Sequence, residues 1–279
     1  MTKILYSDKY VDNKIEEIKK KIQNLKVVPK IALIRTTDDA GTIAYEKGIN
    51  STAKKLGVEV DKHLLENVSE EDLISEIKKL NDDKSVGGIL IFKPLPENIN
   101  EDNIAREISP EKDIDCLNPL NTAKVYAGDV SGFIPLAPKA SIELLKFYDY
   151  KLKGKETLVI NHSNVVGKPL TMILLNELAT VTIAHIGTQD LKKHTKNADI
   201  IFTAVGKPEF LDKSYFNENA TVIDIGTSKN KDGKFVGDLN EESVDGYIKA
   251  FSPVPKGVGS ITNILLIENV VNYYINYEK

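Results

Sequence analysis

The chain has 279 residues and a formal net charge of −4. That length is long for one hydrophobic core and short for three, so we expect two domains. The acidic balance disfavours a nucleic-acid partner, and a single cysteine, Cys116, excludes a disulfide framework. No histidine pair has metal-helix spacing, so no metal is expected. The sequence starts without a signal peptide, and no apolar stretch reaches the roughly 18 residues of a membrane span. We therefore expect a cytoplasmic protein without a membrane partner.

The first part of the chain alternates helical and strand-like patterns. Ile15, Ile18 and Ile22 recur at spacings of three and four, which predicts a helix. Further along, the pattern predicts strands over residues 31–34, 58–63 and 88–92, and helices over 40–56 and around 73–80. Short strands separated by helices are typical of βαβ units and a mostly parallel sheet.

A second α/β series follows an irregular segment. Residues 109–138 show no clear period, and we interpret them as an interdomain connection. Beyond them the pattern predicts strands over 157–160, 181–184, 200–205 and 221–225, and helices over 167–178, 191–196 and 261–277. The fold class is therefore α/β, with two domains.

The segment 158–170 reads as a strand, a turn and the start of a helix, which is where dinucleotide-binding domains hold a pyrophosphate. Of the expected glycines only Gly167 is present, and Asn161 stands where the first would be. Asn tolerates a positive φ, so the turn can still form. The next predicted strand ends at His185-Ile186 with no acid for a ribose and no arginine for a 2′-phosphate. The pattern alone leaves a nucleotide site and an ordinary βα turn open, and the cofactor choice with them.

Several motifs together resemble the methylenetetrahydrofolate dehydrogenase/cyclohydrolase family, FolD, of which the chain looks like a divergent member. The family's S-x-x-Y-x-x-x-K resembles residues 42–49, G-I-L-V-Q-L-P-L-P resembles 88–96, K-D-V-D-G resembles 112–116, G-x-S-x-x-V-G-x-P resembles 161–169, A-V-G-x-P matches 204–208, and P-V-P-G-G-V-G-P resembles 253–260. The resemblance covers nearly the whole chain.

The resemblance implies a fold and an activity. It implies a folate domain of residues 1–138 completed by a returning C-terminal helix, 260–279, and a Rossmann-like domain of 139–259. Family members oxidise 5,10-methylenetetrahydrofolate with a nicotinamide cofactor, usually NADP and possibly NAD here. Most then hydrolyse the methenyl product to 10-formyltetrahydrofolate. They are usually homodimers.

The resemblance also implies which residues act. Tyr45 and Asp115 stand at the positions that stack on the folate and anchor its pterin ring, and we take them as the catalytic pair. The family's lysine falls on Ile49 and its orienting glutamine on Phe92, and neither side chain moves protons. The hydrolytic step is therefore predicted to be weak or lost. Lys93 could substitute only if it turned into the site, against the alternation of a strand.

Two further groups of residues complete the prediction. Besides Tyr45, Ile49, Phe92 and Asp115, the substrate site is predicted to include Ile91, Lys93, Pro255, Gly257, Val258 and Gly259. The cofactor site is predicted to include Asn161, His162, Ser163, Val166, Gly167, His185, Ile186 and Thr227. Two alternatives stay open: a fully bifunctional enzyme with a substitute proton-relay residue, and a non-catalytic homologue that binds a folate, a nucleotide or a protein.

Overall fold

The computed structural model describes residues 1–277, which form two compact units. The six-stranded unit comprises Met1–Val11, Val125–Gly128 and Pro135–Thr262, and the three-stranded unit comprises Asp12–Lys124, Asp129–Ile134 and the chain from Asn263 onward. Both contain parallel sheets with connecting helices, as the predicted α/β class requires. The units do not coincide with the expected ranges at the N-terminus, because Met1–Val11 groups with the six-stranded unit.

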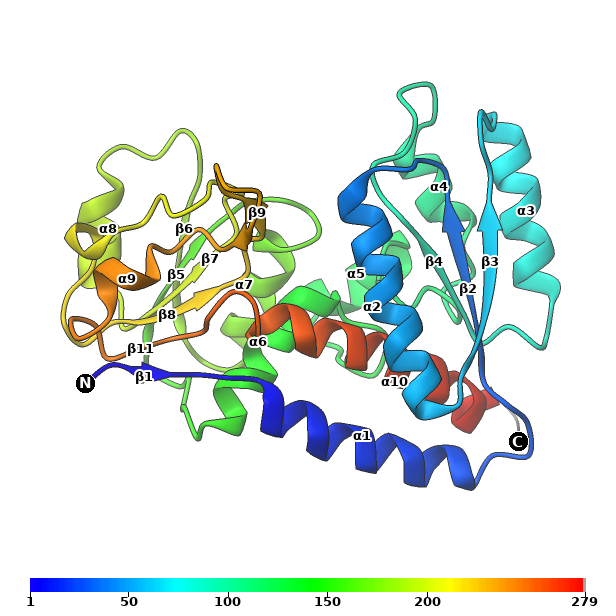
Figure 1. Ribbon diagram of the computed structural model, residues 1–279, viewed down its shortest axis with the longest axis horizontal. Coiled ribbons are helices and arrows are strands. Elements are labelled where there is room, and N and C mark those ends of the chain that lie inside the picture. The colour runs from blue at the N-terminus through cyan, green and yellow to red at the C-terminus, as the bar shows by residue number, and fades with distance from the viewer. Residues whose placement is uncertain (278–279) are drawn as a thin grey trace. The chain divides into compact units, whose positions relative to one another are not determined.

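The three-stranded unit has a parallel sheet in the order β3-β2-β4, whose strands lie side by side in Figure 1. Its core forms where the inward residues of these strands, among them Ile34 and Ile91, pack against Leu73 and Ile77 of a helix. The elements are β2 (Lys30–Arg35), α2 (Ala40–Leu56), β3 (Glu59–Leu64), α3 (Glu70–Asp82), β4 (Gly88–Ile91), α4 (Glu101–Glu107) and α5 (Pro119–Tyr126), with most of α1 (Asp8–Gln23) and of α10 (Val258–Tyr277).

The six-stranded unit has the strand order β1-β11-β8-β7-β5-β6, with every pairing parallel. Its elements are β1 (Lys3–Ile4), α6 (Leu136–Phe147), β5 (Glu156–Ile160), α7 (Gly167–Asn176), β6 (Thr180–Ala184), α8 (Leu191–Asn197), β7 (Ile200–Thr203), β8 (Thr221–Asp224), α9 (Glu241–Val244) and β11 (Ala250–Phe251). A short antiparallel hairpin of β9 (Ser228–Lys229) and β10 (Phe235–Val236) and a 3-10 turn, Lys213–Tyr215, complete it. The order reverses at β5, whose neighbours β7 and β6 lie on its two sides, and such a switch point is where doubly wound sheets bind ligands.

The prediction of an irregular connection over residues 109–138 is wrong in part. Helix α5 begins at Pro119, a residue that suits a first helical position, and the side chain of Asn118 accepts a hydrogen bond from the backbone N–H of Leu120. The apolar period is hidden because a polar residue, Asn121, is buried on the inner side of this short helix. Helix α6 also begins inside the segment, at Leu136.

Two short strands had no sequence signal. Strands β1 and β11 have two residues each, too few for an alternating pattern to show, yet they pair with each other and extend the large sheet. Within residues 1–277 no helix combines the length and the apolar character that a membrane crossing needs.

Candidate functional site

Helix α2 places two of the predicted substrate residues on one face. Asp39 caps its first turn, accepting hydrogen bonds from the backbone N–H groups of Gly41 and Thr42. Tyr45 and Ile49 follow at a spacing of four and so share a face of the helix. Ile49 is completely buried, whereas Tyr45 is half-buried. The position of the family's lysine is therefore an apolar interior position in this chain.

The end of strand β4 provides the next part of the site. Ile91 and Phe92 are both buried, and the Phe92 ring meets the Tyr45 ring edge-to-face, with 5.8 Å between centroids. Edge-to-face pairs of this kind are favourable, so Phe92 holds the Tyr45 ring in place. The structure thus brings Tyr45 and Phe92 together, as the resemblance implies, with an aromatic side chain in place of an amide.

Lys93 points away from the buried row, as strand alternation predicts. Its side chain is 42% exposed, and its Nζ lies 2.6 Å from a carboxylate oxygen of Glu101 in α4. Its backbone carbonyl accepts a hydrogen bond from the Thr42 hydroxyl, 3.2 Å away. The main chain at Lys93 is thereby tied to helix α2, while the ammonium lies at the surface.

The segment from Lys112 to Asp115 is built into the unit by its first residues. The Lys112 ammonium is buried and donates to the carbonyls of Leu80, Asn81 and Asp83 at the end of α3, at 2.7 to 2.9 Å. Orphan carbonyls at a helix C-terminus favour a cation, which explains a buried lysine here. This anchor sets the position of the acid three residues further on.

Asp113 and Asp115 look alike in sequence but differ in structure. Asp113 is fully buried and accepts three hydrogen bonds, all at 2.8 Å, from Leu117 N, Asn118 N and the Asn121 amide. The Asp115 carboxylate accepts none from residues 1–277 and is half-buried. Because this carboxylate is only partly buried and accepts no hydrogen bond from residues 1–277, both of its oxygens are open to a ligand's N–H groups.

Electrostatics at this carboxylate are unusual. Burial, together with the nearby negative charge of Asp113, raises the pKa of Asp115 to about 7, and the Lys93 ammonium opposes this. Burial, with a smaller effect from Asp115, also raises the pKa of the Tyr45 phenol well above its ordinary value. The Tyr45 phenol therefore stays neutral, whereas the raised pKa of Asp115 lies near neutral pH.

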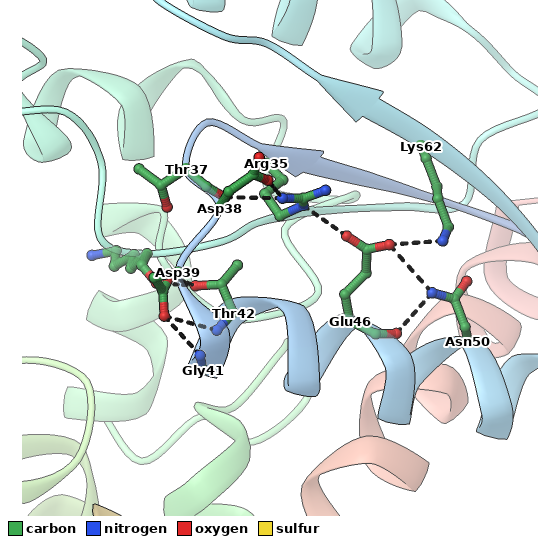
Figure 2. A network of polar contacts seen from close by, with 10 residues as sticks. Arg35, Thr37, Asp38, Asp39, Gly41, Thr42, Glu46, Asn50 and Lys62 are labelled. Atoms are coloured by element: carbon green, nitrogen blue, oxygen red, sulfur yellow. Dashed lines mark hydrogen bonds and ion pairs between the residues drawn. The ribbon is translucent and has the colours of Figure 1, made fainter.

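A polar network holds the far side of helix α2, and the sequence reading missed it. Figure 2 shows the Glu46 carboxylate between Arg35 of β2 and Lys62 of β3, at 2.9 and 2.7 Å. Arg35 also contacts Asp38 and donates to the carbonyl of Thr37. Burial works to raise the pKa of Glu46, but these cations outweigh it and hold the pKa below its usual value. One carboxylate thus fastens the helix that carries Tyr45 to two strands.

In the six-stranded unit, Asn161 shapes the predicted turn through its side chain. Its Oδ1 accepts hydrogen bonds from Ser163 N and Gly167 N, and its Nδ2 donates to the carbonyl of Ala204. Asn161 does not have a positive φ, so the expectation that it replaces a left-handed glycine is wrong. The amide side chain provides the contacts that close the turn instead.

Gly167 is needed for the close approach of helix and strand. A Cβ at this position would lie 2.1 Å from the carbonyl oxygen of Asn161, so no other residue fits. Ser163 Oγ accepts from Val166 N at the same turn. The backbone N–H groups of Asn164 and Val165, just before α7, donate to no acceptor within the described residues. Free N–H groups before a helix are what an anionic pyrophosphate requires, so the turn fits a dinucleotide.

The other predicted cofactor residues lie at the ends of neighbouring strands. His162 follows β5 and His185 follows β6, and their rings are 5.3 Å apart. Ile186 is 91% exposed, so its side chain is accessible to a ligand. Thr227, after β8, is also exposed.

Two acids for which the sequence predicts no role support these loops. Asp238 is buried and accepts hydrogen bonds from Thr203 Oγ1 and from the N–H groups of Val205, Gly206 and Lys207. Asp224, which is also buried, has its pKa raised to about 7 by burial. In the sequence, Asp224 follows the apolar residues 222–223 and Asp238 follows residues 235–237. An acid at the end of a strand can either hold the protein's own loops together or bind a ligand, and this pattern does not distinguish the two roles.

The predicted loop before α10 is tightly built. A Cβ at Gly257 would lie 2.3 Å from the carbonyl oxygen of Pro253, so this position requires glycine. Lys256 has a φ of 75°, a left-handed conformation that is unfavourable for a lysine. Of the other predicted substrate residues in this part of the chain, Val258 is buried, whereas Pro255 and Gly259 are exposed.

The predicted substrate and cofactor residues are divided between the two units of the fold. Tyr45, Ile49, Ile91, Phe92, Lys93 and Asp115 lie in the three-stranded unit, and the other predicted residues lie in the six-stranded unit. The described residues contain no group of three His, Cys, Asp or Glu side chains that could hold a metal.

Comparison with known proteins gives the family. The catalytic-domain model of tetrahydrofolate dehydrogenase/cyclohydrolase matches residues 5–115, and the NAD(P)-binding-domain model matches residues 135–278. The bifunctional protein FolD of Clostridium botulinum strain Langeland is 43% identical over 276 residues, which is 98% of each chain.

Comparison with solved structures gives the same family. The bifunctional FolD of Campylobacter jejuni is 35% identical with a TM-score of 0.96, covering 99% of both chains. The FolD of Trypanosoma brucei, solved with NADP and an inhibitor, is 25% identical with a TM-score of 0.93, over 100% of this chain and 99% of that one. These matches extend over both units, and the chain belongs to the tetrahydrofolate dehydrogenase/cyclohydrolase family.

Proposed function

We propose that this protein oxidises 5,10-methylenetetrahydrofolate to the 5,10-methenyl compound with NAD(P), and that it hydrolyses the product only weakly. The observation that carries the proposal is the Asp115 carboxylate, which accepts no hydrogen bond from residues 1–277, together with a Tyr45 ring that is braced by Phe92. A flat heterocycle with N–H groups is the ligand that such a ring and such an acceptor suit.

Each residue of the proposed substrate site has a separate role. Tyr45 stacks on the pterin ring, and Asp115 accepts from its N–H groups. Ile49 and Phe92 are buried apolar walls that exclude water but neither donate nor accept a proton. The oxidation depends mainly on holding substrate and cofactor in register, whereas hydrolysis needs a group that orients water and moves protons. The first step can therefore proceed here without the family's lysine.

The turn before α7 is the proposed cofactor-binding element. The free N–H groups of Asn164 and Val165 bind the pyrophosphate, and Asn161, Ser163, Val166 and Gly167 keep the turn in shape. A bound nicotinamide cofactor supplies the two-electron acceptor for the oxidation. His162 lies after β5, and the residues directly after β6, His185-Ile186-Gly187, include no carboxylate to repel a 2′-phosphate. With the NADP complex of the Trypanosoma brucei relative, this supports a weak preference for NADP over NAD.

The alternative of a fully bifunctional enzyme needs a substitute for the lysine. Lys93 is the candidate, but its ammonium pairs with Glu101 at the surface, which leaves the interior position apolar. We also propose that the protein is a cytoplasmic homodimer. Strand β6 is an unpaired edge of the large sheet that carries the exposed Ile183, and exposed edges of this kind are normally covered.

The test uses both ligand binding and turnover. Millimolar NADP, and less strongly NAD, should raise the melting temperature of the protein, because a ligand that binds only the folded state stabilises it. Methenyl formation from 5,10-methylenetetrahydrofolate should then be visible by absorbance with NADP. If neither cofactor shifts the melting temperature and no methenyl compound appears, the proposed function is wrong.

A further inference from the structure

Asp238 is a completely buried acid that the proposed chemistry does not use. Its Oδ1 accepts hydrogen bonds from Gly206 N and Lys207 N, at 2.8 and 3.0 Å. Its Oδ2 accepts from Val205 N and from the Thr203 hydroxyl, at 2.6 and 2.8 Å. Consecutive N–H groups that turn to one side form a concavity for an anion, and Gly206, with a φ of 73°, supplies the left-handed residue of that turn. The carboxylate therefore fixes the backbone of the loop after β7.

The backbone of Asp238 is itself tied to the far end of that loop. Leu211 N donates to the Asp238 carbonyl, 2.9 Å away, and Asn240 N donates in return to the Leu211 carbonyl, at 3.0 Å. Glu209 N also donates to the carbonyl of Gly237, at 3.0 Å. The carboxylate thus projects from a paired segment, and its position does not depend on the four donors alone.

Asn161 connects this loop to the turn before α7. The carbonyl of Ala204, directly before the three N–H groups, accepts a hydrogen bond from Asn161 Nδ2 at 2.7 Å. The Oδ1 of the same amide accepts from Ser163 N and Gly167 N, at 2.8 and 2.9 Å. One planar group therefore joins the loop after β7 to the turn. In the motif that residues 161–169 resemble, the first position is glycine, which has no side chain to make this connection.

We propose that Asp238 is a positioning residue for the cofactor, which sets NADP affinity by holding the Ala204 carbonyl against Asn161. The proposal rests on the proposed function, since it assigns the turn before α7 to the pyrophosphate. Asp238 acts through Asn161 and takes no part in hydride transfer. The affinity of this chain for NADP then depends on an acid that lies 77 positions after the turn residue it controls.

Asp238→Asn tests the first step of this connection. An asparagine accepts with one oxygen only, so the N–H groups that face its NH₂ group lose their partner and the loop relaxes. The Kd of NADP, measured by calorimetry on the full-length protein, should rise about three- to tenfold, which is the loss of about one hydrogen bond. In turnover, the KM for NADP should rise by the same factor while kcat stays near the wild-type value. A lower kcat with an unchanged KM for NADP would overturn the proposal.

A double-mutant cycle with Asn161→Ala tests whether the effect passes through Asn161. Asn161→Ala breaks the connection, so in that background Asp238→Asn should change the Kd of NADP by less than about twofold. If Asp238→Asn weakens NADP binding by the same factor in both backgrounds, Asp238 does not act through Asn161 and the proposal is wrong.

Two further variants separate positioning from general stability. Asp113→Asn also removes a buried acid with several donors, but in the three-stranded unit, and should leave the Kd of NADP unchanged. An equal rise in both variants would assign the effect to lost stability. Where Asp238→Asn does not fold, Thr203→Val takes its place in the cycle, because it removes one donor from Asp238 at nearly constant volume. The same coupling to Asn161→Ala is then expected, at smaller size.

A measurement without ligand keeps this test apart from that of the proposed function. The side-chain NH₂ group of Asn161, labelled with ¹⁵N and assigned by its absence in Asn161→Ala, is followed by NMR. Its exchange with solvent should be about three- to tenfold faster in Asp238→Asn than in the wild type, because its acceptor is no longer held. An Asn161 signal with the same shift and exchange rate in both proteins would overturn the proposal. Failure of the wild type to bind NADP or NAD would instead contradict the proposed function, and the exchange rates would still show whether Asp238 holds Asn161.

Discussion

At the scale of single residues, the site is defined by which polar groups the protein leaves without partners. Asp113 and Asp115 stand two positions apart, yet three donors surround the first and none reaches the second. The same contrast separates Asp238, which four donors satisfy, from a carboxylate meant for a ligand. The pattern of hydrogen-bond partners therefore supports Asp115 as the proposed binding acid, a distinction that residue type alone does not make.

Replacing Asp115 by Asn should abolish folate binding and stabilise the protein. In the folded chain Asp115 keeps its proton up to a pKa of about 7, while an unfolded aspartate loses it near a pKa of about 3.9. The neutral acid therefore favours folding at low pH, and this contribution is lost as the pH rises from about 4 to 7. The stability advantage of Asp115→Asn, measured by urea unfolding, should grow across that range and level off above it.

Asp113→Asn is the matched control. The side-chain NH₂ group of an asparagine in this position would face one of the three N–H donors that Asp113 now accepts from, and that donor would lose its hydrogen bond. The variant should therefore lose about 1–3 kcal/mol of stability. It should still bind folate if it is folded. Equal folate affinities for Asp115→Asn and wild type would refute the assignment of Asp115.

A second prediction at this scale concerns backbone strain. Lys256 has a φ of 75°, and a left-handed conformation is unfavourable by about 1–2 kcal/mol for a residue with a Cβ. Lys256→Gly removes that strain, partly offset by the greater freedom of glycine in the unfolded chain, and should stabilise the protein by about 0.5–1 kcal/mol. Lys256→Ala retains the Cβ and should show no gain in chemical denaturation. A gain of the same size in both variants would assign the effect to charge.

At the scale of elements, helix α2 and strand β4 determine what the site can do. They place Tyr45 against Phe92, and they bury Ile49 where the family has its lysine. The network of Arg35, Glu46 and Lys62 fastens the opposite side of the helix. We therefore expect the chemistry of the site to depend on two residues, Ile49 in α2 and Phe92 directly after β4.

Exchange of both positions should restore hydrolysis. Ile49→Lys alone places an ammonium at a fully buried position without a partner, and Phe92→Gln alone leaves an amide with nothing to orient. The double variant supplies both members of the hydrogen-bonded pair. Methenyl hydrolysis, followed by loss of absorbance, should increase in the double variant by more than the product of the two single effects. Strictly multiplicative effects would contradict the coupling.

The sequence predicted the elements better than their contacts. The helix over residues 40–56 coincides with α2, because an apolar period and a following Gly57 define both ends. Strands β1 and β11 were missed because two residues carry no period. The proximity of Tyr45 and Asp115 came only from resemblance to a family, since 70 residues separate them in the chain. The Arg35–Glu46 pair was missed because strand and helix patterns do not show which side chains face each other.

At the scale of the whole molecule, the exposed edge of the large sheet predicts self-association. Among residues 1–277 no strand pairs with the outer side of β6. This strand carries Ile183, 40% exposed, close in sequence to the exposed Leu175 and Leu178. Ile183→Lys should convert a dimer to monomers in sedimentation, because a lysine on an edge strand opposes pairing. Leu120→Lys, an equally drastic change at an exposed residue of the three-stranded unit, should leave the mass unchanged. A monomeric wild type, or a dimeric Ile183→Lys, would contradict the prediction.

The two reactions of the family separate most clearly when each is measured on the same preparation. The wild-type protein is given 5,10-methylenetetrahydrofolate with NADP to measure methenyl formation, and then 5,10-methenyltetrahydrofolate alone to measure hydrolysis above the spontaneous rate. General acid–base groups contribute about 10²–10⁴ in rate, so hydrolysis should be slower than in a lysine-bearing relative by at least about 10²-fold, with formation much less affected. Brisk hydrolysis by the unmodified protein would contradict the account, because a residue other than the buried Ile49 and Phe92 would then have to relay the proton.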